Sequence, residues 1–281
     1  MQISVPKDLV VFLEPSEDSD TRLRFAAELA RRWQAHLIAT FVVRELALDP
    51  HAGFAVGPAF ASMLAEHSRR TTKALAKARN TFDGLVHDRS FTAEWRVSEG
   101  EDGEDLMLHA RHASFAVLGP PALQQVGVTR LGLSEQMIFG SGRPCLLLPE
   151  GWSKEHHAQR IVVGWNGGRE AARSIADAMP FLTTAESVHL VVVPGARLRG
   201  AYGQEPGADM ATHLARHGVP VLLEQHSGSD AGELLLGRCR ALDADLLVVG
   251  GCAHSRVGEF GFGRATRKIL KTARIPLLMS R

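Results

Sequence analysis

Cysteine is scarce in this sequence: the 281 residues include three, Cys145, Cys239 and Cys252. They lie far apart and form no Cys-x-x-Cys pair, so neither a disulfide framework nor a cysteine-based zinc site is indicated. We therefore expect a reducing, cytoplasmic environment. Cys145 and Cys239 are predicted to be core residues. Cys252 lies near Arg256 in a glycine-rich stretch, where a lowered pKa would make the thiol redox-sensitive, with a small buried thiol as the alternative.

Long hydrophobic runs are also absent. No stretch approaches the roughly 18 apolar residues that a membrane helix needs. Near the N-terminus, the apolar run 9–13 is interrupted by Glu14 and Pro15, and it has neither a basic start nor a small-residue cleavage site. This run predicts a strand rather than a signal peptide. We expect a soluble protein with no membrane association.

The sequence has no strong excess of either charge, and its formal net charge is +1. This balance removes the simplest argument for nucleic acid as a partner. The first 150 residues contain 16 Lys and Arg against 19 Asp and Glu, whereas the rest contain 16 against 12. An anionic ligand is therefore expected in the second part of the chain.

The chain reads as one α/β unit repeated. Short apolar runs bounded by turn residues predict buried parallel strands. In the first copy they cover residues 8–13, 36–43, 91–97, 114–119 and 144–148, and in the second residues 160–165, 187–193, 220–226, 245–250 and 275–279. Amphipathic spacing predicts helices over residues 21–33, 59–82 and 103–112, and over residues 170–182, 208–217 and 231–241.

The predicted fold class is α/β, with two tandem, doubly wound, five-stranded parallel sheets of Rossmann-like type in a pseudo-twofold arrangement. Residues 149–159 are polar apart from Trp152, lack periodicity and form the predicted linker. We expect one domain over residues 1–149 and a second over residues 159–281, each with its own core. The two short apolar fifth strands are expected to pair with one another, because exposed apolar edges are a liability.

Ligands of such sheets bind beyond the carboxyl ends of the strands, where the winding direction reverses. In the second copy this place is formed by the loop after residue 165 and by a glycine-rich stretch that runs from Gly250 to a helix starting near Arg264. A loop of this kind offers backbone N–H groups and the positive end of a helix dipole to a phosphate. The predicted contacts are Trp165, Asn166, Gly167, Gly250, Gly251, Ala253, His254, Ser255, Gly263, Arg264, Ala265 and Thr266.

This stretch resembles the tandem-domain universal stress proteins. Their nucleotide-binding members carry Gly, two residues, Gly, nine residues, Gly and then Ser or Thr after the fourth strand. Gly250, Ala253 and Gly263 keep that spacing, and residues 162–167 and 274–278 extend the resemblance over nearly the whole chain. The resemblance implies a fold like that of the adenine nucleotide alpha hydrolases, ATP or AMP as ligand, and a role in the stress response as a sensor or regulator.

Three residues depart from the family's pattern. Asn166 stands where nucleotide-binding members have an Asp that meets the adenine, and it keeps an acceptor and adds a donor. Ala253 replaces a Gly, at a strain of about 1–2 kcal/mol if the loop requires a positive φ there. Arg264 replaces a hydroxyl residue, although its backbone N–H remains and its guanidinium can pair with a phosphate.

The first copy is predicted to be a structural half with a degenerate site. Its corresponding loop keeps Gly119, but Pro120 and Pro121 remove two backbone donors, and Glu14 stands where the second copy has Asn166. Any nucleotide is therefore expected in the second copy alone.

No catalytic motif stands near these loops, so we expect binding rather than turnover. Two alternatives remain open: a stress-type protein that has lost its ligand and acts through protein contacts, and an enzyme of adenine-nucleotide chemistry.

No metal is predicted, because the spaced histidine pairs lack acidic or cysteine partners. The basic face of the last helix is interpreted as solvated. The chain is also expected to form a homodimer through residues 47–82, which have no counterpart in the second copy. The apolar side chains of Phe54, Val56, Phe60 and Met63 are too many to leave exposed in one patch, and the alternative is that they fold onto their own domain.

Overall fold

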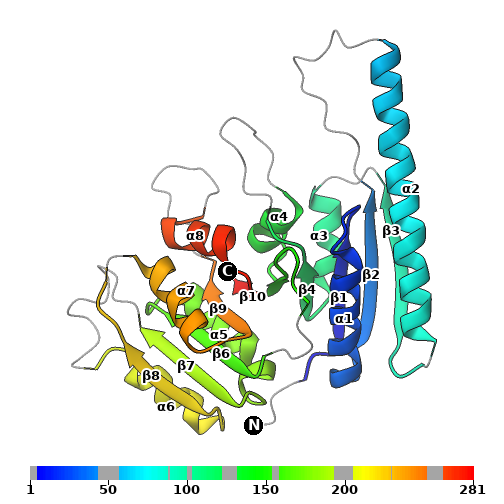
Figure 1. The fold of residues 1–281 in the computed structure, drawn as a ribbon. Helices are drawn as coiled ribbons and strands as arrows, with labels where there is room; N and C mark the ends of the chain where they lie inside the picture. The colour runs from blue at the N-terminus through cyan, green and yellow to red at the C-terminus, as the bar shows by residue number, and fades with distance from the viewer. Residues whose placement is uncertain are drawn as a thin grey trace.

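The computed structural model describes residues 5–43, 57–87, 89–99, 103–121, 132–153, 158–192, 205–228, 230–251 and 262–281. These residues form one ten-stranded sheet in the order β3-β2-β1-β4-β5-β10-β9-β6-β7-β8, with helices on both faces (Figure 1). Residues up to β5 supply one half of the sheet, and residues from β6 onward supply the other.

The helices and strands follow one another in the same sequence in both halves. The first half contains β1 (Asp8–Leu13), α1 (Ser19–Trp33), β2 (His36–Val43), α2 (Pro58–Val86), β3 (Ala93–Glu99), α3 (Gly103–Arg111), β4 (Phe115–Leu118), α4 (Leu133–Gly140) and β5 (Cys145–Leu147). The second half contains β6 (Arg160–Trp165), α5 (Arg169–Leu182), β7 (Ser187–Val192), α6 (Ala208–Arg216), β8 (Val221–Gln225), α7 (Ala231–Ala241), β9 (Leu246–Gly250), α8 (Arg264–Thr272) and β10 (Leu277–Ser280).

All pairings within each half are parallel, and β1 and β6 hold the central position of their halves. The halves meet through an antiparallel pair, in which Leu277 of β10 lies opposite Leu147 of β5 and Met279 opposite Cys145. The predicted pairing of the fifth strands is thereby confirmed. The apolar edges of β5 and β10 are therefore covered by one another. Because the pair is antiparallel, the strands of the first half and those of the second half have their carboxyl ends on opposite sides of the continuous sheet.

Several predicted boundaries are wrong by one to four residues. β3 begins two residues late and continues to Glu99, because its pairing with β2 persists through the polar residues Ser98 and Glu99. α2 runs on to Val86, whose side chain packs against the core. β10 begins after Pro276, which has no N–H to donate to a ladder.

The core is divided by the faces of the sheet rather than by the halves of the chain. One buried cluster joins α1, α2, α5 and α6 to the sheet, and the other joins α3, α4, α7 and α8 to its opposite face. Phe181 of α5 contacts Trp33 of α1 and Phe115 of β4, with ring centroids 4.9 and 5.8 Å apart. The expectation of a separate core for each half is therefore wrong, because aromatic side chains pack across the junction.

The chain between the halves is anchored to the first half. The Trp152 ring packs edge-on against Phe25, with centroids 5.4 Å apart. The Gly151 N–H donates to the Asp18 carboxylate over 3.2 Å. Residues 154–157 lie outside the described residues. No helix in the described part of the chain has the length and hydropathy that crossing a membrane requires.

Candidate functional site

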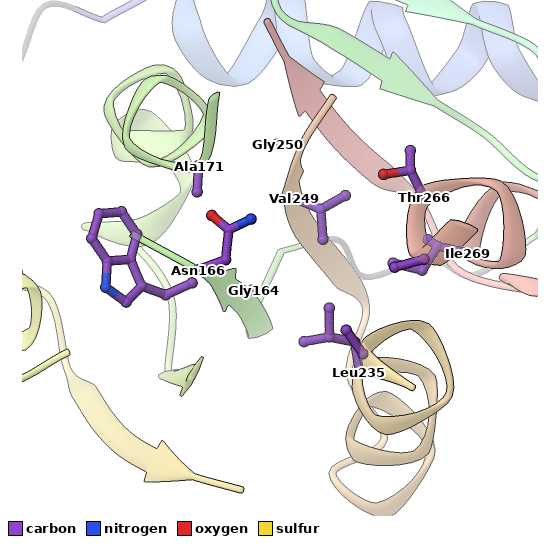
Figure 2. A pocket seen from close by; sticks show the side chains of 11 residues that line it. Gly164, Asn166, Ala171, Leu235, Val249, Gly250, Thr266 and Ile269 are labelled. Carbon is purple, nitrogen blue, oxygen red and sulfur yellow. The ribbon is translucent and has the colours of Figure 1, made fainter. Parts of the chain in front are cut away.

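A pocket of about 170 Å³ lies at the carboxyl ends of β6 and β9 in the second half. The helices that begin nearby, α5, α7 and α8, close its sides (Figure 2). This is the place at which a doubly wound sheet binds ligands. The residues that line it are Gly164, Trp165, Asn166, Ala171, Ala231, Leu235, Val249, Gly250, Ala265, Thr266 and Ile269.

Close packing of α5 against the end of β9 forms one wall of the pocket. Gly250 is essential to this contact, since a Cβ there would lie 2.7 Å from the backbone N of Ala171 and from the carbonyl carbon of Glu170. The buried Ser174 hydroxyl donates to the Val249 carbonyl over 2.9 Å and accepts the Ser280 N–H over 3.1 Å. α5 is thus fixed to both β9 and β10.

The turn after β6 is stabilised by the side chain of Asn166, which lies within it. The Asn166 Oδ1 accepts the Gly168 N–H over 2.9 Å, and Gly167 has a φ of 67°, which favours glycine. Figure 2 shows Asn166 beside Ala171, across the pocket from Leu235 and Ile269. The Asn166 oxygen is therefore engaged within the turn.

α7 and α8 are joined by charged side chains next to the pocket. Asp230 accepts the Glu233 N–H at the start of α7 and pairs with Lys268 of α8 over 2.9 Å. Lys268 also pairs with Glu233 over 2.9 Å, and these contacts with Asp230 and Glu233 raise the Lys268 pKa. Lys268 is thus not part of a freely solvated basic face, whereas Arg264 and Arg267 are exposed.

Uncharged side chains line the described pocket, and among them Thr266 is only 6% exposed. α8 begins after Gly263, and no side chain in the described residues caps its first turn. The N–H groups at the start of a helix lack intrahelical partners, so they and the helix dipole favour an anion. The pocket therefore combines a neutral interior with a rim that can bind negative charge.

The structure brings part of the predicted set together. Trp165, Asn166, Gly250, Ala265 and Thr266 line the pocket. Gly263 and Arg264 begin α8, and Gly167 lies in the turn after β6. The Gly251 N–H donates to the Ser280 carbonyl over 2.8 Å, which places Gly251 against β10. Ala253, His254 and Ser255 lie outside the described residues, as does Cys252.

Sequence reasoning identified Trp165 and Ala265 but missed the other apolar residues of the lining. Ala171 begins the apolar face of α5, and the helix pairs Ala231/Leu235 and Ala265/Ile269 are each four residues apart. That spacing places both members of a pair on one helix face and is the available signal. The predicted set was built from groups that bind phosphate, so it described the rim of the pocket better than its interior.

The corresponding place in the first half is filled. Arg22 of α1 is 4% exposed, and its Nη1 donates to the Phe12 carbonyl at the end of β1 over 2.9 Å. A Cβ on Gly119, after β4, would overlap this guanidinium. The degenerate site is thus blocked by a buried side chain, a cause that the loop prolines alone did not predict.

Other predicted features lie away from the pocket. The rings of His213 on α6 and of His217, the residue after that helix, are 4.7 Å apart, but no group of three or more His, Cys, Asp and Glu able to hold a metal occurs in the described residues. Burial raises the pKa of the Cys145 and Cys239 thiols to about 12. Both cysteines are core residues, as expected.

Comparison with solved structures finds the same fold over the whole chain. A universal stress protein from Archaeoglobus fulgidus DSM 4304 matches with 15% identity and a TM-score of 0.68, over 97% of this chain and 96% of that chain. A protein of unknown function from Pseudomonas aeruginosa PAO1 matches with 14% identity and a TM-score of 0.64, over 98% and 92%. No protein-family model matches the sequence, and no curated protein matches it. The resemblance to universal stress proteins is confirmed in the fold, at two-domain length.

Proposed function

We propose that this chain is a tandem universal stress protein that binds an adenine nucleotide, ATP or AMP, in its second half. The observation that carries the proposal is the neutral pocket between β6 and β9, adjoining the uncapped start of α8. A planar, uncharged base suits such an interior, and phosphates suit the helix start. The likeness to solved structures supports the fold; the ligand is argued from the pocket.

The size of the pocket limits how such a ligand would lie. Sites that enclose a whole small molecule have about 300–1,000 Å³, whereas this pocket has about 170 Å³. The base would therefore be inside, against Leu235, Val249 and Ile269. The ribose and phosphates would extend past Thr266 to the start of α8, where the exposed Arg264 can pair with a phosphate.

The test is direct. Protein purified under native conditions is denatured, and the released small molecules are identified by mass spectrometry. ATP and AMP are then titrated into the ligand-free chain by calorimetry, with GTP as the control for base recognition. The proposal requires one adenine nucleotide bound per chain. It fails if no nucleotide is released and no heat is observed at millimolar concentrations of either nucleotide.

We propose that the chain acts as a sensor or regulator rather than an enzyme. Among the described residues that line the pocket there is no acid, base or nucleophile pair of the kind that turnover needs. Incubation with ATP, followed by analysis for AMP and ADP, distinguishes this proposal from an enzyme of adenine-nucleotide chemistry. A chain that binds no nucleotide but retains protein partners would support a role through contacts alone.

Two further proposals concern the setting of the protein. A cytoplasmic location is consistent with the unpaired, buried thiols of Cys145 and Cys239. A homodimer is supported by the exposed Met63 and Leu64 in the first part of α2. The apolar stretch 47–56 that was predicted to contribute lies outside the described residues.

A further inference from the structure

The first half contains a buried arginine at the same sheet position as the pocket of the second half. The Arg22 guanidinium lies between the end of β1, where it donates to the Phe12 carbonyl, and Gly119 after β4. Its Nε has no hydrogen-bond partner among the described residues. A guanidinium has five N–H donors and one carbonyl satisfies only part of them, so the residues around Arg22 must stabilise its buried charge in another way.

The two halves can be compared residue by residue through α1 and α5. The buried positions of α1 repeat in α5, with Phe25, Ala26, Leu29 and Ala30 matching Ser174, Ile175, Ala178 and Met179. In that alignment Arg22 takes the place of Ala171, which lines the open pocket. Gly119 likewise takes the place of Gly250, and both glycines contact the helix that follows the first strand of their half.

Other positions around the site change in a coordinated way. Ser134 replaces Ala265, and its hydroxyl donates to the Gly119 carbonyl over 2.9 Å, which ties the start of α4 to the end of β4. Glu135 replaces Thr266 and is 3% exposed, and Glu14 replaces Asn166. Neutral positions of the second half have thus become acidic in the first.

Glu14 and Asp18 provide a setting for a cation. Burial lowers the pKa of Arg22, and the charges of Glu14 and Asp18 act in the opposite direction. The first-half site therefore has the same position in its half of the sheet as the second-half pocket but the opposite preference in charge. A nucleotide phosphate would meet carboxylates there, whereas a guanidinium finds an acceptor and negative potential.

We propose that Arg22 is a built-in occupant of the first-half site: its guanidinium fills the space that is open in the second half, and the groups around it constitute a guanidinium-binding site rather than an anion site. The inference rests on the geometry of the first half. It does not require that the second half bind a nucleotide.

Chemical rescue tests the proposal. Arg22→Ala removes the occupant and leaves the buried Phe12 carbonyl without the donor it has in wild type, so we expect Tm to fall by about 5 °C or more. Methylguanidinium chloride at millimolar concentration should enter the vacated space and raise the Tm of the variant by about 2 °C, with no increase for wild type. Methylammonium chloride, which lacks the planar fork, is the matched control ligand.

Each outcome decides the matter. Rescue of Arg22→Ala by methylguanidinium alone supports a guanidinium site. Equal effects of both salts on the variant and on wild type overturn it. If Arg22→Ala does not fold by itself, the same comparison is made on its refolding yield, where recovery with methylguanidinium but not with methylammonium carries the same meaning. A failure of nucleotide binding in the second half would leave these readouts unchanged.

Discussion

Arg22 in the first half and Ala171 in the second occupy equivalent positions at the start of equivalent helices, yet one fills its site and the other leaves a pocket. The surrounding backbone is shared: a central strand, a glycine at the end of its neighbour, and the start of a helix beyond. What differs is a small number of side chains. A doubly wound sheet therefore supplies the place for a ligand, and individual side chains decide whether that place is used.

The comparison also shows how each half stabilises its site. In the second half, α5 contacts Gly250 through backbone atoms. In the first half, the contact with Gly119 is made by the flexible end of the Arg22 side chain. Backbone cannot yield to an added methyl group, whereas a long side chain can change its rotamer.

The largest expected effect follows from that difference. Gly250→Ala should destabilise the chain by about 3 kcal/mol, because the new Cβ would lie 2.7 Å from backbone atoms of Glu170 and Ala171. Gly119→Ala should cost about 1 kcal/mol, since Arg22 can move. Urea denaturation of both variants, followed by circular dichroism, measures the difference. Equal losses in the free energy of unfolding would mean that both glycines are packed against equally rigid groups.

A second prediction concerns the rim of the open pocket. Arg264→Ala should weaken adenine-nucleotide binding by about 1.5–3 kcal/mol, the range for a hydrogen bond to a charged group. Arg267→Ala is the matched control, because Arg267 is also exposed on α8 but lies three residues further from the start of the helix. Calorimetric titration of ATP distinguishes the two variants. Similar losses in both would indicate a general effect of positive charge rather than a phosphate contact.

The edge strands provide a third comparison. Glu224 is the fourth residue of β8 and accepts hydrogen bonds from Arg238 and from the rings of His189 and His226, over 2.8, 2.6 and 2.8 Å. Burial alone would raise the pKa of Glu224, but these bonds outweigh it and hold the pKa at about 2. At the same position of β3 the first half has Arg96, beside Glu94 and His109. The second half thus has a negative side chain, Glu224, at the strand position where the first half has a positive one, Arg96.

The pH dependence follows from the sign of that pKa shift. A pKa below the ordinary 4.5 means that Glu224 contributes fully above that pH, and that the contribution is lost as pH falls toward 2. Glu224→Gln should therefore destabilise the chain by about 1.5 kcal/mol at pH 7, with the difference shrinking below pH 4.5. Unfolding by urea at several pH values measures it. A difference that persists undiminished at the lowest pH would show that the carboxylate charge is not the cause.

Much of this architecture could be predicted from the sequence, because buried parallel strands are continuous apolar runs. Residues 8–13, 36–43 and 160–165 are strands with the predicted ends. Asn166, Gly250 and Thr266 were identified because loops after such strands carry polar and glycine residues. Arg22 could not be found in this way. A single arginine in the first turn of an amphipathic helix resembles a solvated residue, and its alignment with Ala171 shows that it lies on the buried face.

The smallest effect on stability, and the last comparison, concerns α2 and its counterpart α6. α2 spans 29 residues, or about 44 Å, whereas α6 spans nine; Figure 1 shows the first part of α2 extending beyond the strands. Met63 and Leu64 in that part are 46% and 40% exposed.

If the surface of Met63 and Leu64 joins two copies, Met63→Lys combined with Leu64→Lys should convert a dimer to a monomer without changing the urea midpoint measured at low concentration. Leu108→Lys is the matched control, because Leu108 is 53% exposed on α3 and should leave assembly unchanged. Sedimentation at tens of micromolar decides the question, and a wild-type chain that is strictly monomeric would exclude the dimer.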